Sequence, residues 1–160
     1  MILWRLNQAA EASRNIGEAA LDARGLFKRW SWQRKFAKSN LELVQDPREA
    51  AVTMMVALAQ SDGAITERER RAILMQIVKR FGATGVQAEA MMAHGRWFAR
   101  DAADVSRCFQ KLTPLVKRSC TPEQIEDILI MVEDVAAAEG VPGAIERDAV
   151  EKLRHTLARS

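Results

Sequence analysis

The sequence predicts an all-α protein: a helical bundle of two similar helix hairpins with further helices between them, preceded by an N-terminal helical arm. Three observations predict this class. Residues that favour helices dominate the composition, with only four Pro, eight Gly and no Tyr. From residue 46 onward, apolar residues recur at helical spacing, and no segment shows sustained strand alternation. The length, 160 residues, is that of one ordinary domain with a sizeable core.

The first two helices of the body are marked by their ends. Asp46-Pro47 supplies an N-cap and a proline at the first helical position, and this helix should stop at Ser61-Asp62-Gly63. The sequence Thr-Glu-Arg-Glu at residues 66–69 is a capping box that opens the second helix, and Gly82 should end it. The predicted buried face of this second helix consists of Ile73, Leu74, Ile77, Val78 and Phe81.

Four more helices are predicted in the rest of the chain. A third helix is expected over about 86–98, and Thr121-Pro122 starts the fifth. The fourth helix has the clearest apolar face, made of Val105, Cys108, Phe109, Leu112, Leu115 and Val116. The last helix follows two glycine-containing turns and should bury Ile145, Ala149, Val150, Leu153 and Leu157.

The N-terminal arm, residues 1–45, differs from the body in charge. Residues 1–48 hold nine basic and five acidic side chains, whereas the remainder is nearly neutral. Aromatic and basic residues alternate over 24–38, so this segment could pack on the bundle or a second subunit, or lie on an anionic membrane surface. Nucleic acid is a weaker alternative because no recognition motif accompanies it. The candidate contact residues are Lys28, Arg29, Trp30, Trp32, Arg34 and Lys35.

The sequence offers no catalytic constellation, which predicts that the protein is not an enzyme. Cys108 and Cys120 lack metal-type spacing and make no disulfide framework, and His94 and His155 have no neighbours at ligand spacing. Neither a glycine-rich phosphate loop nor a Ser-His-Asp signature is found. The cysteine usage and the lack of a bilayer-length apolar run predict a cytoplasmic protein, with peripheral contact at the inner face of the membrane as an extension.

Two segments of the chain repeat each other without gaps. The first is an apolar helix that ends in Asp62-Gly63 and is followed seven residues later by Glu69. The second ends in Glu139-Gly140 and is followed by Glu146 at the same distance. Each acid of the second copy lies 77 residues after its counterpart, which predicts two equivalent hairpins packed against each other.

At these residues the chain resembles the tellurite-resistance TerB family over about 46–158. The family pattern is an apolar helix ending in Ala-x-x-Asp-Gly, then a glutamate that opens the next helix, present twice. The first copy matches fully, whereas the second has Glu139 for Asp and Pro142-Gly143 where the family has polar residues. The resemblance implies a helical bundle, acidic turns able to bind a divalent cation, and a role linked to membrane stress systems. Such domains also occur in co-chaperones, so partner binding is equally compatible.

The acidic turns allow two interpretations. Asp62, Glu69, Glu139 and Glu146 could hold a divalent cation, calcium before others, because hard cations prefer carboxylate oxygens. Alternatively, they only cap helices and shape turns. The predicted function is therefore a non-enzymatic accessory protein in metal (tellurite-type) or envelope stress response. The alternative is a protein-interaction module with structural turns, whose arm mediates oligomer or membrane contact.

Overall fold

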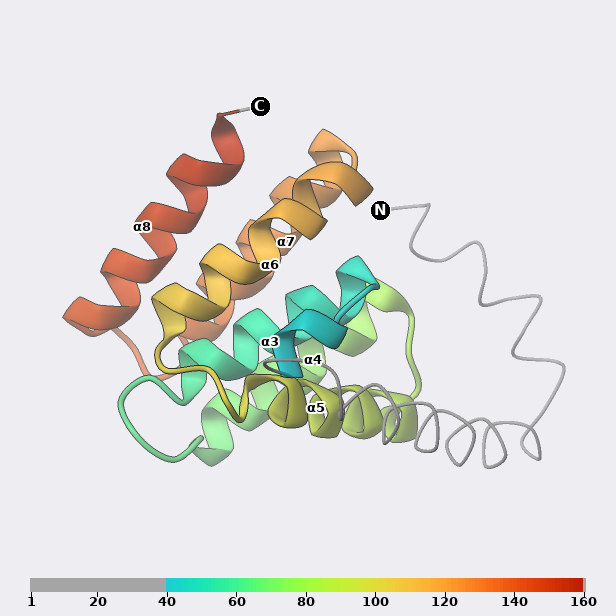
Figure 1. Ribbon diagram of the computed structural model, residues 1–160. Coiled ribbons are helices and arrows are strands. Elements are labelled where there is room, and N and C mark those ends of the chain that lie inside the picture. The colour runs from blue at the N-terminus through green and yellow to red at the C-terminus, as the bar shows by residue number, and fades with distance from the viewer. Residues whose placement is uncertain (1–39, 160) are drawn as a thin grey trace, which may run out of the picture.

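The structure, a computed structural model, describes residues 40–159. A short 3-10 helix, η1 (Asn40–Leu43), precedes six α-helices within this part of the chain (Figure 1). They are α3 (Pro47–Ala59), α4 (Glu67–Phe81), α5 (Gly85–Ala99), α6 (Val105–Ser119), α7 (Pro122–Ala136) and α8 (Ala144–Ala158). The described residues contain no strand, and the predicted all-α bundle is confirmed. None of these helices has the length and apolarity needed to cross a bilayer.

Helix α3 is the centre of the bundle and contacts α4, α5, α6 and α7. All residues from Ala50 to Ala59 are buried, so this helix is covered on every side rather than along one stripe. Its sequence carries no charge after Glu49, as expected of a helix buried all round. Helix α5 approaches α3 closely at Gly95, where an added Cβ would lie 2.9 Å from Val52 Cγ1.

The two predicted hairpins are α3–α4 and α7–α8, and polar contacts join α4 to α7. Arg80 forms an ion pair of 2.6 Å with Asp127, and both side chains are largely buried. One turn earlier in α4, the Gln76 side-chain amide donates to Asp134 at 2.7 Å. Because buried polar groups need partners, these contacts fix how α4 lies on α7.

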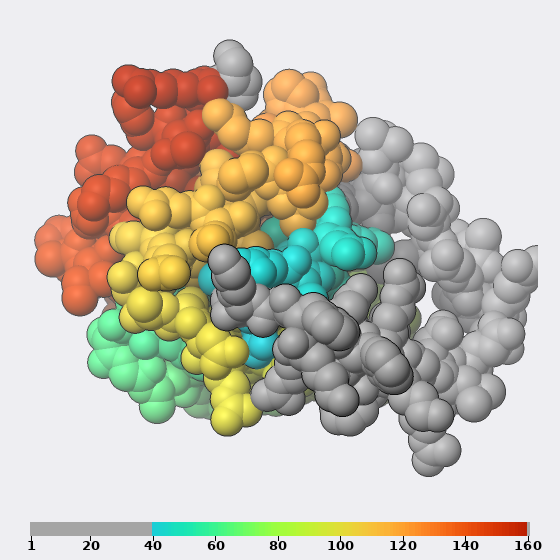
Figure 2. All heavy atoms as spheres, viewed as in Figure 1, coloured from blue at the N-terminus to red at the C-terminus, as the bar shows by residue number. Residues whose placement is uncertain are grey.

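Helices α5 and α6 fill the space between the hairpins. All six residues of the predicted apolar face of α6 are buried. This face packs on α3, and α8 lies against both α6 and α7. Figure 2 shows α6 and α8 side by side on the face in view.

Two predicted core residues are exposed. Val78 is 42% and Ile145 59% exposed, although each was placed on a buried face. Ile73, Ile77 and Phe81 form the inward stripe of α4. Val78 follows Ile77 directly, and because successive residues of an α-helix point in different directions, its side chain lies off this stripe. In the first turn of α8, the nearly buried position is occupied by Glu146. Thus the inward position of that turn holds an acid instead of an apolar side chain.

Candidate functional site

The two acidic turns have the same backbone structure. Helix α3 ends at Ala59 and α7 at Ala136, and each is followed by a turn that contains a glycine with positive φ. These are Gly63, with φ of 143°, and Gly140, with φ of 109°, a region that favours glycine. The glycine N–H donates to the carbonyl three residues earlier, over 3.3 Å in the first turn and 3.0 Å in the second.

The glutamate that opens each following helix also has the same role. Glu69 Oε2 accepts a bond of 2.8 Å from the backbone N–H of Thr66, and Glu146 Oε2 accepts one of 2.8 Å from that of Gly143. The first box is complete because Thr66 Oγ1 accepts from the Glu69 N–H at 3.2 Å. The second lacks this bond because Gly143 has no side chain. Both glutamates therefore cap helices, as one of the two interpretations requires.

The turns bring three carboxylates together. Asp62, Glu69 and Glu146 each offer an oxygen, and these three oxygens lie within 4.8 Å of one another. Asp62 is exposed, whereas Glu69 is 4% and Glu146 9% exposed. The cluster thus combines side chains from both hairpins, although the acids of the two hairpins are separated by about half the chain.

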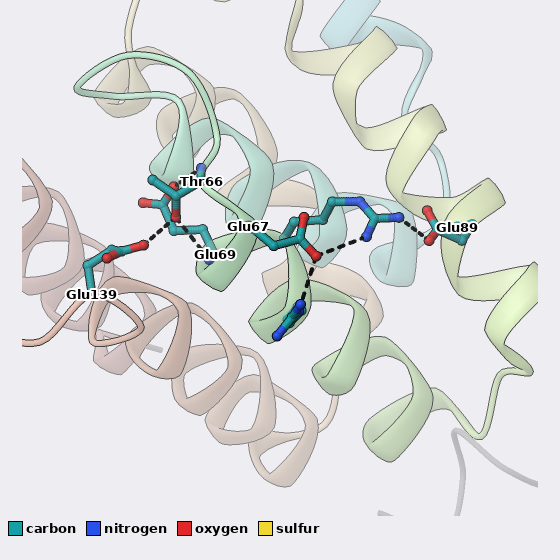
Figure 3. A network of polar contacts seen from close by, with 7 residues as sticks. Thr66, Glu67, Glu69, Glu89 and Glu139 are labelled. Carbon is teal, nitrogen blue, oxygen red and sulfur yellow. Dashed lines mark hydrogen bonds and ion pairs between the residues drawn. The ribbon is translucent and has the colours of Figure 1, made fainter.

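Glu139, the fourth predicted acid, lies beside this cluster and joins the turns directly. Its Oε1 accepts a hydrogen bond from Thr66 Oγ1, and its Oε2 lies 3.9 Å from a guanidinium nitrogen of Arg68. Figure 3 shows Glu139 reaching from the second hairpin towards Thr66 and Glu69 of the first. All four predicted site residues consequently belong to one region of the surface.

Helix ends rather than basic side chains compensate the charges of the three clustered acids in the described residues. Within the described residues, no basic side chain forms an ion pair with Asp62, Glu69 or Glu146. The N-terminal ends of α4 and α8 offer partial positive charge to Glu69 and Glu146, which lie in their first turns. Each of these glutamates uses one oxygen for its cap, so the other remains available to a ligand.

A buried hydroxyl precedes Asp62 in the sequence. Ser61 precedes Asp62 directly, and its Oγ is buried with no hydrogen-bond partner in the described part of the chain. A buried polar atom without a partner is uncommon and calls for an explanation such as an ion or water. Carboxylate oxygens are hard ligands, so the three clustered acids fit a hard divalent cation.

Sequence reasoning found the four acids but not how they meet. The constant offset predicted equal turns, whereas the contact between Thr66 and Glu139 depends on how the hairpins pack. Ser61 had no sequence signal of its own, because the equivalent residue of the second copy is Ala138. The six predicted contact residues of the arm, Lys28 to Lys35, lie outside the described residues.

The cysteines show no sign of reactive chemistry. Burial raises the pKa of the Cys108 thiol to about 12, with a smaller contribution from Asp104. Burial and the nearby Asp46 raise the pKa of the Cys120 thiol to about 11. Both groups are therefore protonated near neutral pH and are poor nucleophiles.

Comparison with known proteins identifies the family. The sequence model of the family described as "Tellurite resistance protein TerB" matches residues 48–159, which include both hairpins and all four acids. No match was found among curated proteins or among solved structures. Since this match covers well over half of the sequence, the chain belongs to the TerB family.

Proposed function

We propose that this protein is a non-enzymatic accessory protein in metal (tellurite-type) or envelope stress response, and that it binds a divalent cation between its two acidic turns. One observation carries the proposal: Asp62, Glu69 and Glu146 converge within 4.8 Å without a basic side chain paired to them in the described residues. Three carboxylates held this close repel one another unless a cation neutralises them.

Calcium is the preferred candidate. It accepts six to eight oxygen ligands in flexible geometry, so water can complete a shell that three carboxylates begin. Magnesium demands stricter octahedral geometry, and zinc favours nitrogen and sulfur ligands, which the cluster lacks. The small number of converging acids supports weak binding, with a dissociation constant of about 10⁻⁴ to 10⁻³ M.

Scanning calorimetry with calcium, magnesium or zinc tests the proposal. A cation that binds only the folded state stabilises it by about 2.7 kcal/mol at a concentration of 100 times the dissociation constant. We expect a selective rise in melting temperature with calcium. Asp62→Asn combined with Glu69→Gln should abolish the rise, because these replacements keep shape while removing charge.

A matched control distinguishes the loss of charge at the cluster from a change in the net charge of the protein. Asp148→Asn combined with Glu151→Gln also removes two negative charges, but from exposed positions of α8 outside the cluster. This control should keep the calcium response of the wild-type protein. Absence of a shift with every cation, or equal loss in both double variants, contradicts cation binding at the turns.

A second candidate function rests on the capping bonds themselves. Glu69 and Glu146 accept backbone N–H groups at 2.8 Å, which is a sufficient structural role for both. The protein would then be an interaction module with purely structural turns. In that case no cation shifts the melting temperature, and Glu146→Gln changes stability by less than about 1 kcal/mol because the amide oxygen still caps the helix.

A further inference from the structure

A cluster of exposed apolar side chains lies on the side of the molecule formed by α4 and α5. Met75 is 64%, Val78 42% and Val86 82% exposed. Together with the partly buried Leu74, they line a shallow hollow, here called the α4–α5 patch. In the described part of the chain five large apolar side chains are this exposed, and three of them belong to this patch. Clustering of this kind marks interaction sites on folded proteins.

The fold does not require apolar residues at these positions. The outer surface of α4 begins with Glu67, Arg68 and Arg71, all exposed, and becomes apolar only at Met75 and Val78. Val86 lies in the first turn of α5, where polar or acidic residues are favoured. Since these side chains contribute little to the core, their burial against another surface would be favourable.

The charges at the patch are balanced and lie at opposite ends. Lys79 and Glu89 are the two charged residues among those lining the hollow. Lys79 is in the last turn of α4, next to the loop that leads into α5. Glu89 contacts Arg70, which lies in the opposite half of α4. One oxygen of Glu89 meets Arg70, which leaves the other for an external partner.

This arrangement is self-complementary and therefore fits a second copy of the chain. A strongly acidic or basic partner would be opposed by either Lys79 or Glu89. If a two-fold axis instead passes through the centre of the patch, near Met75 and Val78, the Lys79 end of one copy faces the Glu89 end of the other. Opposite charges then meet in both halves of the interface, as an isologous dimer requires.

We propose that the α4–α5 patch is the interface of a two-fold symmetric homodimer. Met75, Val78 and Val86 of the two copies pack together at its centre. Lys79 of each copy pairs with Glu89 of the other at its ends. The dimer leaves the acidic turns outside the contact, so this proposal is independent of cation binding.

Sedimentation equilibrium of the full chain over a wide concentration range tests the contact. The wild type should show a monomer–dimer equilibrium, and Met75→Glu should weaken it by about tenfold or more because two charges would be buried without partners. Val141→Glu is the matched control, since Val141 is 87% exposed but lies at the second acidic turn. Thermal melts confirm that both variants are folded.

Charge reversal tests the two-fold geometry. Lys79→Glu alone and Glu89→Lys alone should each be monomeric, because each brings like charges together at both ends. An equimolar mixture of the two variants should form a heterodimer, since every contact then joins a lysine to a glutamate. A wild type that stays monomeric, a Met75→Glu dimer as stable as the wild type, or a mixture without heterodimer overturns the proposal.

Discussion

Removing one charge from the acidic cluster should stabilise the cation-free protein. Asp62 lies within 4.8 Å of carboxylate oxygens of both Glu69 and Glu146. At that separation two like charges repel by about 0.9 kcal/mol in a water-like dielectric, the value suited to the exposed Asp62. Its side chain makes no hydrogen bond to described residues, so Asp62→Asn loses no such bond. After screening, the expected gain from two partners is about 1 kcal/mol.

Thermal unfolding in chelator and low salt measures this gain as a rise of about 3–5 °C. Added salt should narrow the difference, because screening relieves the repulsion in the wild type. Saturating calcium should reverse the order of the two proteins, since only the wild type keeps the full donor set. Asp148→Asn, which removes an exposed partner of Lys152, is the control and should not be stabilised. The reasoning is refuted if the melting temperature of Asp62→Asn in chelator is equal to or lower than that of the wild type.

Three further predictions concern other parts of the chain. Gly95→Ala should lower the free energy of unfolding by about 1 kcal/mol in chemical denaturation, because the clash of its Cβ with Val52 Cγ1, 2.9 Å away, outweighs the gain in helix propensity. Gly85→Ala is the control and should be tolerated, since its Cβ would meet nothing within 4 Å. If residues 24–38 bind membranes, the full chain should float with anionic vesicles and be released by salt; equal recovery with neutral vesicles argues for packing instead. The raised thiol pKa values predict slow reaction of Cys108 and Cys120 with a thiol reagent at pH 8, and the buried Cys108 should react only as the protein unfolds. Rapid modification of Cys108 in the folded chain would contradict its burial.

The helices could be predicted from the sequence because their signals are local. Asp46, Thr66 and Thr121 were identified as N-caps from their neighbours alone, and each accepts the expected backbone N–H. The apolar face of α6 was also correctly predicted, since one side of that helix is charged and the other is not. Helix α5 starts at a second Thr capping box, Thr84, that sequence reasoning overlooked.

The errors and omissions have a common physical cause. Helical periodicity indicates which residues share a face but not how much of that face another helix covers. Val78 and Ile145 are therefore predicted to be buried from the sequence, although both are exposed in the structure. The convergence of Asp62, Glu69 and Glu146 likewise depends on tertiary packing. The constant offset of the repeat shows which residues of the two hairpins are equivalent, but not how far apart they lie in space.

A calcium titration monitored by NMR tests most directly the central claim that the two acidic turns share one cation. If one ion is shared by the acidic turns, the backbone amides of Gly63 and Gly140 should shift together and saturate with the same dissociation constant. Gly82 caps the opposite end of α4 from Glu69, so the NMR signal of its amide should not shift. Absence of any shift, or a response confined to one turn, would contradict a cation site built from both hairpins.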